Sequence, residues 1–271
     1  MLLEIQHRTH YTYDQIVHLE PQHFYFLPLQ RSYFKTLEFR LTSNPLPRLQ
    51  SQRIDLENNA YFQCWYDQAL TRLEIEVSMR LETNSFNPFD FLEESGTPLP
   101  TDLAQSPFLI DSDIAKPLED WARQFAESTG KSISFLTAIC AAIHEEWNHQ
   151  ARYDETLMSP EACFEKKEGS CRDLSWMLIV MLRRLNFPAR FVSGYSFNPE
   201  LGDGHELHAW VEVFVRGGGW IGLDPSSGLL TTDSYIPVAT SHTPSHTLPV
   251  QGTFRGNAQS TLETSVEITI H

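Results

Sequence analysis

Stretches of alternating hydrophobic and polar residues fill the first third of the chain. Every second side chain of a strand faces the same side, so this pattern predicts β-strands with one buried face. Turn-forming pairs such as Asn44-Pro45 and Asn58-Asn59 separate the stretches. We therefore expect residues 2–85 to form an antiparallel, sandwich-like module. Residues 84–107 are expected to form a linker that packs against the protein through its Phe residues.

In the middle of the chain the hydrophobic residues recur at helical spacing. Three helices are predicted, over residues 112–126 with a cap at Ser112, over residues 133–150, and from near Cys171 to the stop at Asn186-Phe187-Pro188. The stretches ARFVSGYSF, ELHAWVEVFV and GWIGLDPSS that follow alternate again and predict three strands. Helices followed by strands, in place of strict alternation, favour an α+β fold.

These changes of pattern divide the chain into three parts. We expect residues 1–100 to form a β-rich N-terminal domain with its linker, and residues 101–240 to form a core of helices and strands. Residues 241–271 form a tail rich in Ser, Thr, His and Pro that ends in one more alternating stretch. That last stretch is a candidate to return and complete a sheet.

Composition and charge exclude several classes of protein. The 271 residues are 41% hydrophobic, which is enough for one large globular domain or two smaller ones with cores. A formal net charge of -15 argues against binding nucleic acid or anionic lipid. The first residues reach a charge at Glu4, so we expect no signal peptide, and no run of about 18 apolar residues predicts a membrane helix. We expect a cytoplasmic protein without nucleic-acid or membrane partners.

The position of Cys171 is unusual for a packing cysteine, because it lies where an apolar helix is predicted to begin. If Ser170 is the N-cap, Asp173 falls at the third helical position, the two form a capping box, and Cys171 is the first residue of the helix. The unpaired N–H groups and the positive end of the helix dipole favour an anion there. The thiol pKa is therefore expected to fall below the usual ~8.5. The N–H of Cys171 is also placed to bind the oxyanion formed when a carbonyl is attacked.

A histidine and an aspartate follow on two neighbouring strands. His208 and Asp224 lie symmetrically about Arg216, which begins the glycine-rich turn between the strands. Residues paired in a hairpin are equidistant from its turn, so we expect His208 and Asp224 to lie side by side. An aspartate next to an imidazole fixes its tautomer and stabilises its charged form, as a nucleophilic site needs.

These stretches together resemble a known family. GSCRDLSWMLIVMLRRLNFPARFVSGYSF, HAWVEVFV and GWIGLDPSSG resemble the core of the transglutaminase-like superfamily. HRTHYTYDQIVHLEPQHFYFLPLQ resembles the β-rich module that precedes this core in bacterial members. The resemblance implies a papain-like fold with an all-β N-terminal domain. It also implies that Cys171 is the nucleophile, His208 the general base and acid, and Asp224 the orienting carboxylate. Ser226 stands where the family often has Thr, which keeps a hydroxyl.

The chemistry implied is acyl transfer or hydrolysis at an amide or peptide carbonyl through a thioester. Water as acceptor gives a cysteine protease or amidase, which we favour, and an amine gives a transglutaminase. The chain has no D-x-D-x-D-G calcium loop, so the resemblance supports thiol acyl chemistry more firmly than cross-linking. We expect a peptide or protein substrate and no cofactor. The alternative from another class is a module of the same fold that binds a peptide or protein without turnover.

Metal binding is not expected. HEEWNH differs from the zinc motif H-E-x-x-H because Asn148 stands where the second histidine is needed. On a helix, His144 and His149 would point about 140° apart, too far to share a metal. His205 and His208 could in principle gather a metal with His242 and His246, but histidines in a Ser-, Thr- and Pro-rich tail are more often solvated.

The other cysteines and the tryptophans near the motifs are interpreted as packing residues. Cys64 and Cys140 fall on apolar faces and are expected to be buried, and free thiols are expected throughout. Cys163 precedes Cys171 by eight residues and could form a regulatory disulfide with it if their Cα atoms approach within about 6 Å, although packing is favoured. Trp147, Trp176 and Trp210 could wall an acyl-binding groove, but core packing is the default for each.

Overall fold

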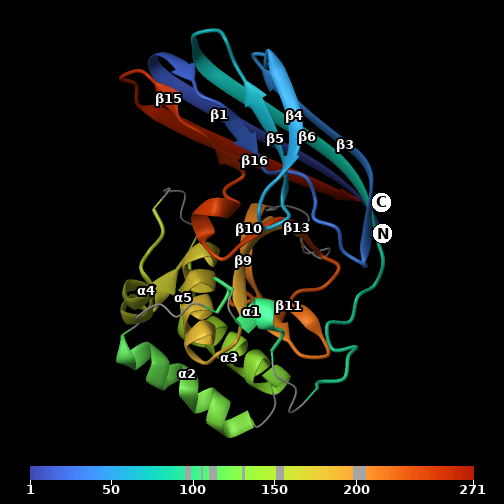
Figure 1. The fold of residues 1–271 in the computed structure, drawn as a ribbon, viewed down its shortest axis with the longest axis vertical. Coiled ribbons are helices and arrows are strands. Elements are labelled where there is room, and N and C mark those ends of the chain that lie inside the picture. Colours follow the sequence, from blue (N-terminus) through green and yellow to red (C-terminus); the bar gives the residue numbers. More distant parts are fainter. Residues whose placement is uncertain (95–98, 105, 110–114, 130–131, 151–155, 198–205) are drawn as a thin grey trace.

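The computed structural model describes the chain except for residues 95–98, 105, 110–114, 130–131, 151–155 and 198–205. Two β-sheets lie at one end, and the helices gather with a third sheet at the other (Figure 1). The fold is α+β, as the order of the sequence patterns predicts. The described residues contain no helix that is both long and apolar enough to span a membrane.

The N-terminal sheets include strands from both ends of the chain. The larger sheet has the order β15-β1-β6-β3, with β16 also paired to β1, and contains β1 (Leu2–Leu19), β3 (Phe34–Asn44), β6 (Leu70–Thr83), β15 (Phe254–Arg255) and β16 (Ser260–Ile270). The smaller sheet has the order β14-β2-β5-β4 and contains β2 (Gln22–Phe24), β4 (Leu49–Ile54), β5 (Ala60–Trp65) and β14 (Val250–Gln251). Phe39 and Phe62 stack across the two sheets, and the C-terminal strand runs antiparallel to β1 from Leu3↔Ile270 to Tyr13↔Ser260.

The helices pack against one face of the third sheet. This sheet has the order β12-β11-β10-β9-β13 and contains β9 (Ala189–Ser196), β10 (Glu206–Val215), β11 (Gly219–Asp224), β12 (Leu229–Leu230) and β13 (Tyr235–Ser241). The helices are α1 (Thr101–Ala104), α2 (Lys116–Thr129), α3 (Ser132–Glu146), α4 (Pro160–Lys166), α5 (Cys171–Arg184) and the 3₁₀ turn η1 (Pro244–Thr247). A short parallel pair joins β7 (Asn148–His149) to β8 (Glu168–Gly169).

The third sheet belongs to two hydrophobic cores. Val211 and Val213 of β10 are buried with the helices, whereas Ile236 and Val238 of β13 are buried with the N-terminal sheets. Glu212 reinforces the junction, because its buried carboxylate pairs with Arg190 at 2.6 Å and with Arg31 at 2.7 Å. Burial alone would raise the pKa of Glu212, but these two guanidinium groups lower it. The N-terminal region and the core are therefore joined by apolar and ionic contacts.

The helices differ from the sequence prediction at several places. The first long helix begins at Lys116, whereas the expected cap Ser112 lies outside the described residues. The second helix ends at Glu146 rather than near residue 150, because the backbone of Asn148 and Gln150 bonds to Lys167 and Gly169. Segment 160–166, which shows no clear period, is the short helix α4 with Ser159 as its N-cap.

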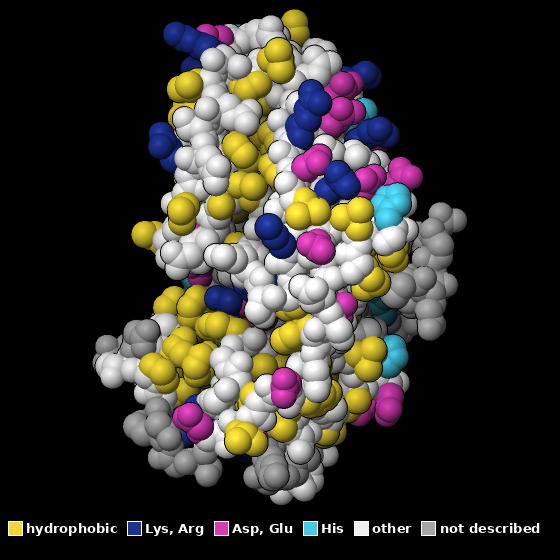
Figure 2. All heavy atoms as spheres, turned by 90° about the vertical axis from the view of Figure 1, so that its right-hand side faces the viewer, with side chains coloured by type: hydrophobic (Ala, Val, Ile, Leu, Met, Phe, Trp, Pro, Cys, Tyr) yellow, Lys and Arg dark blue, Asp and Glu magenta, His cyan; other side chains and the backbone are white. Residues whose placement is uncertain are grey.

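The surface carries no single charged field on the face shown in Figure 2. Side chains of both charge signs lie near one another there, with hydrophobic side chains between them. Several described pairs are ion pairs across strands, such as Arg80 with Glu38 at 2.9 Å. Such exposed pairs contribute little stability, about 0–1 kcal/mol each.

Candidate active site

The start of α5 is fixed by a capping box. The Ser170 N–H donates to the Asp173 carboxylate at 2.8 Å, and the Asp173 N–H donates back to the Ser170 hydroxyl oxygen at 3.4 Å. Gly169 comes just before, where a Cβ atom would lie 2.9 Å from the Asp173 Cβ and 3.1 Å from the Cys163 sulfur. Cys171 is thus the first helical residue, and the predicted capping box is confirmed.

His208 and Asp224 meet as the hairpin argument predicts. The Nε2 atom of His208 lies 2.8 Å from Oδ2 of Asp224. The Asp224 side chain is 3% exposed and that of His208 is 14% exposed, so the pair is almost out of water. Because Nε2 contacts the carboxylate, Nδ1 is the ring nitrogen left to face the sulfur of Cys171.

The centre of the hairpin is one residue later than Arg216, so the pairing register differs from the predicted one by two residues. Val215 pairs with Gly219 and Val211 with Leu223, so the strands are symmetric about Gly217. Continued by one residue, this register sets Asp224 level with Trp210, two residues from His208 along β10. Side chains two residues apart on a strand face the same side, so the diagonal contact still forms.

Two further groups hold the Asp224 carboxylate. The backbone N–H and the hydroxyl of Ser226 both donate to Oδ1, at 2.9 and 2.6 Å, and the hydroxyl of Tyr235 donates to Oδ2 at 2.8 Å. Burial alone would raise the pKa of Asp224, but the charge of His208 and these donors lower it, so the group stays ionised. The hydroxyl that Ser226 shares with the usual Thr therefore has a specific partner.

Cys171 lies among donors that stabilise its thiolate. Burial by itself would raise the pKa of the thiol, but hydrogen bonds from the side chains of His149 and His208, the charge of His208 and the backbone N–H of Ala209 lower it to about 6. The residue remains partly exposed at the surface. At neutral pH the sulfur is therefore an accessible anion. The direction of the shift is the predicted one, but its causes are the two histidines and Ala209 and not the start of the helix.

His208 carries the matching positive charge. Burial alone would lower its pKa, but the carboxylate of Asp224 and the sulfur of Cys171 raise it to about 10. Between the two values the site holds a thiolate and an imidazolium together. In that range the sulfur is negatively charged and the imidazole beside it is protonated.

His149 was missed as a site residue. The sequence places it on a helix, where it faces away from His144, but it lies in β7 opposite Gly169, two residues before Cys171. The parallel bridge to β8 brings its ring to the sulfur. No local signal predicts this, because the contact depends on pairing between segments far apart in sequence. Tyr235 was missed for the same reason.

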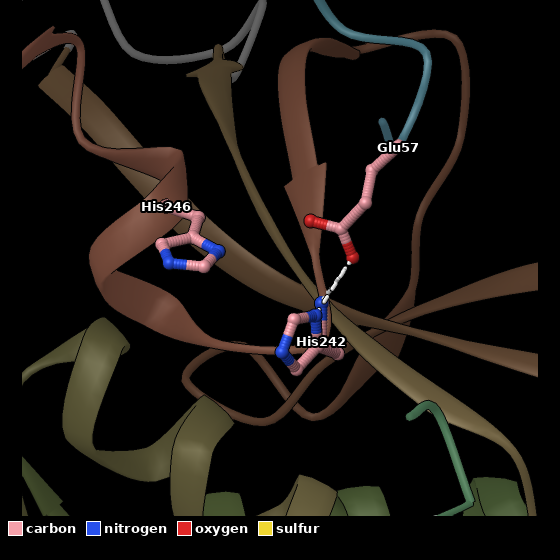
Figure 3. A group of neighbouring side chains, drawn as sticks. All are labelled: Glu57, His242 and His246. Carbon is pink, nitrogen blue, oxygen red and sulfur yellow. Dashed lines mark hydrogen bonds and ion pairs between the residues drawn. The ribbon is translucent and has the colours of Figure 1, made fainter. Parts of the chain in front are cut away.

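The other candidate residues lie elsewhere. His144 contacts the carbonyl oxygen of Ser226 through Nδ1 at 2.7 Å, and His205 lies outside the described residues. His242 and His246 are not with His208 but beside Glu57 (Figure 3).

The remaining cysteines and the tryptophans largely pack as expected. The described cysteines form no disulfide, and Cys64, Cys140 and Cys163 are buried. Burial raises the pKa of the Cys64 thiol to about 12, and burial followed by the charge of Asp224 raises that of Cys140 further. Trp147 belongs to the core around the helices, the partly buried Trp176 packs against this core, and Trp210 is buried as well.

Two family models match the chain. Residues 3–82 match the bacterial transglutaminase-like N-terminal region, and residues 119–225 match the transglutaminase-like superfamily. The chain carries a transglutaminase-like core. The three residues that the resemblance selects, Cys171, His208 and Asp224, all lie within this transglutaminase-like core.

Relatives of the transglutaminase-like chain include proteins of mycobacteria and Pseudomonas. It is 32% identical over 107 residues to the uncharacterized protein ML0607 of Mycobacterium leprae, which is 37% of each protein. It is 28% identical over 120 residues to a protein-glutamine gamma-glutamyltransferase of Pseudomonas aeruginosa, or 39% of this chain and 18% of that protein. The chain therefore spans well under half the length of these two relatives.

A solved structure shares the fold over nearly the whole chain. It comes from Cytophaga hutchinsonii and is named as a candidate cysteine protease. The match covers 99% of this chain and 90% of that one, with a TM-score of 0.76 and 20% identity.

Proposed function

We propose that this transglutaminase-like protein is a thiol enzyme that acts on an amide or peptide carbonyl through Cys171, His208 and Asp224. One observation carries the proposal: the sulfur of Cys171 contacts an imidazole that Asp224 holds at 2.8 Å. This contact helps to lower the thiol pKa to about 6. A buried packing cysteine has the opposite property, as the raised pKa of Cys64 shows. The site is thus built to keep a sulfur anionic.

The proposed reaction has two stages. The thiolate of Cys171 attacks the carbonyl carbon, a C–S bond forms, and the C–N bond breaks as the imidazolium of His208 gives its proton to the leaving amine. Neutral His208 then takes a proton from the acceptor, whose oxygen or nitrogen attacks the thioester, and the C–S bond breaks to restore the thiolate. We assign two donors to the oxyanion formed at each stage, the backbone N–H of Cys171 and the ring N–H of His149.

Water is the acceptor we favour, so the product is a carboxylic acid and the enzyme is a protease or amidase. An amine acceptor is the second candidate, supported by the name of the Pseudomonas relative. A given site takes one or the other according to the shape of its groove and its exclusion of water. Both candidates use the same three residues.

Selective alkylation tests the thiol chemistry. We expect iodoacetamide to modify Cys171 from about pH 6 upward, as read by peptide mass spectrometry, because the thiolate is the reactive form. Cys64 and Cys140 are internal references in the same sample, since both are buried with raised pKa values. His208→Ala is expected to abolish the modification below pH 8. Equal rates at Cys171 and Cys64 would favour a module that binds a peptide without turnover.

A peptide pool with and without a fluorescent primary amine separates the two acceptors. Hydrolysis predicts shorter peptides or deamidated side chains in both samples, and amine transfer predicts labelled peptides only where the amine is present. Cys171→Ser is the matched control, because it keeps a similar shape and removes the thiolate. Products that persist in Cys171→Ser would show that another group performs the chemistry.

A further inference from the structure

A second cluster of polar side chains lies between the N-terminal region and the core. Glu57 is in the turn between β4 and β5, His242 follows β13, and His246 is in η1. The three side chains converge in Figure 3, and each offers a ligand atom within 4.8 Å of the other two. Among the described residues this is the one group of three or more His, Cys, Asp or Glu side chains close enough to hold a metal ion.

The turn that carries Glu57 is rigidly held. Asp55 accepts hydrogen bonds from the backbone N–H groups of Glu57 at 2.8 Å and Asn59 at 2.9 Å. The Asn59 side chain is fully buried and exchanges two hydrogen bonds with the backbone of Thr240, both at 2.8 Å. Glu57 is therefore fixed against the segment that carries the two histidines.

The spacing of the donor atoms approaches that of a tetrahedral metal site. Ligands about 2.0–2.1 Å from a tetrahedral zinc lie roughly 3.3 Å apart. Oε1 of Glu57 and Nδ1 of His242 are already 3.0 Å apart. The His246 ring is exposed and packs edge-on to His242 with ring centroids 5.5 Å apart. Its ligand nitrogen lies within 4.8 Å of the other two ligand atoms, so this ring has to move only a short way to complete the spacing.

The charges at the cluster suit a cation of moderate affinity. Glu57 is the acidic member of the cluster, and its Oε1 accepts a hydrogen bond from the backbone N–H of His242 at 2.9 Å. The guanidinium of Arg183 donates to the His242 carbonyl oxygen at 2.7 Å and brings a positive charge near Glu57. This positive charge repels a bound cation, so we expect the site to bind a metal ion more weakly than a site with four protein ligands and no such charge.

We propose that Glu57, His242 and His246 bind one divalent transition-metal ion of the Zn²⁺ class, in a site that ties the β4–β5 turn to the segment after β13. Two imidazoles and one carboxylate are donors that zinc accepts, with water in the fourth position. On binding, Nδ1 of the neutral His242 ring gives its lone pair to the metal, and the ring proton is carried on Nε2. The proposal does not depend on the thiol chemistry and revises the expectation that the tail histidines are merely solvated.

Zinc titration of tag-free, metal-stripped protein tests the site. The protein carries Cys171→Ala, because the thiolate and its histidines would otherwise compete for zinc. Calorimetry is expected to give about one zinc per chain, and zinc is expected to raise the melting temperature. His246→Ala and Glu57→Gln should each weaken binding by more than about tenfold and remove the rise in melting temperature. His18→Ala removes an exposed histidine of β1 and should change neither.

The His246→Ala variant can be tested without loss of the fold. His246 is exposed, so its removal is not expected to unfold the protein, and circular dichroism without metal checks this. Cobalt titration adds a second readout, since visible absorption bands report a tetrahedral site and should vanish in His246→Ala. The proposal fails if no zinc binds, or if His246→Ala and Glu57→Gln bind zinc as tightly as the parent.

Discussion

Removing the imidazole of His149 is expected to raise the pKa of Cys171. Among the groups that lower this pKa, His149 has a larger effect through its hydrogen bond than His208 or Ala209 has through its own. In His149→Ala the thiolate loses this donor and keeps the other two. The thiol should then hold its proton to higher pH.

The size of the effect follows from the strength of a hydrogen bond to a charged group. Such bonds contribute about 1.5–3 kcal/mol, and we take the low end because His149 is solvent-exposed. About 1.5 kcal/mol is about one pKa unit, so the thiol pKa would move from about 6 to about 7. The thiolate fraction would fall from about one half to about one tenth at pH 6, and from about nine tenths to about one half at pH 7.

Alkylation rates across pH measure this directly. We expect His149→Ala to react with iodoacetamide about fivefold more slowly at pH 6, about twofold more slowly at pH 7 and equally fast at pH 9. His149→Gln keeps an N–H donor and should recover part of the loss. His144→Ala is the control, because its ring contacts the Ser226 carbonyl at 2.7 Å and not the sulfur. A His149→Ala profile that superimposes on the parent would refute the assignment of His149 to the thiolate.

Three further substitutions probe other parts of the account. Asp224→Asn should lower turnover by at least about a hundredfold. It should also move the alkaline limit of activity to lower pH, because His208 loses the negative charge that raises its pKa, and an unchanged pH profile would contradict this. Ser170→Ala removes the helix cap and should lower the free energy of unfolding, measured in urea melts, by about 1 kcal/mol. The control is Ser128→Ala at an exposed position, which should lower it by less than about 0.5 kcal/mol. Gly194→Ala should leave little folded protein by circular dichroism, since its Cβ would lie 2.2 Å from a backbone oxygen of β13, and a normal melting curve would argue against this packing.

Local sequence signals predict the parts of the site that local structure builds. The capping box at Ser170 and Asp173 needs only neighbouring residues, so it fixes Cys171 at the helix start without knowledge of the fold. The glycine-rich turn likewise brings His208 to Asp224. The predicted turn centre was wrong by one residue, because several glycines allow several centres, and the pairing register therefore differs by two residues. The contact survived because a shift of two residues keeps both side chains on the same face.

Contacts between distant segments could not be predicted in this way. The hydrophobic repeat of the second helix continues through Trp147, yet the helix ends at Glu146 because the backbone that follows pairs with β8. That pairing, 20 residues away in sequence at His149 and Gly169, decides where His149 lies. Glu57 is 185 residues from His242, so their contact likewise follows only from the packed fold.

The central claim is that Cys171 and His208 form an ion pair at neutral pH. Ultraviolet absorbance of the thiolate, titrated in the parent protein and subtracted against Cys171→Ser, measures the ionisation of this one sulfur. We predict a transition with an apparent pKa of about 6 that moves upward in His208→Ala. A transition near the ordinary thiol value of ~8.5, unchanged in His208→Ala, would contradict the account.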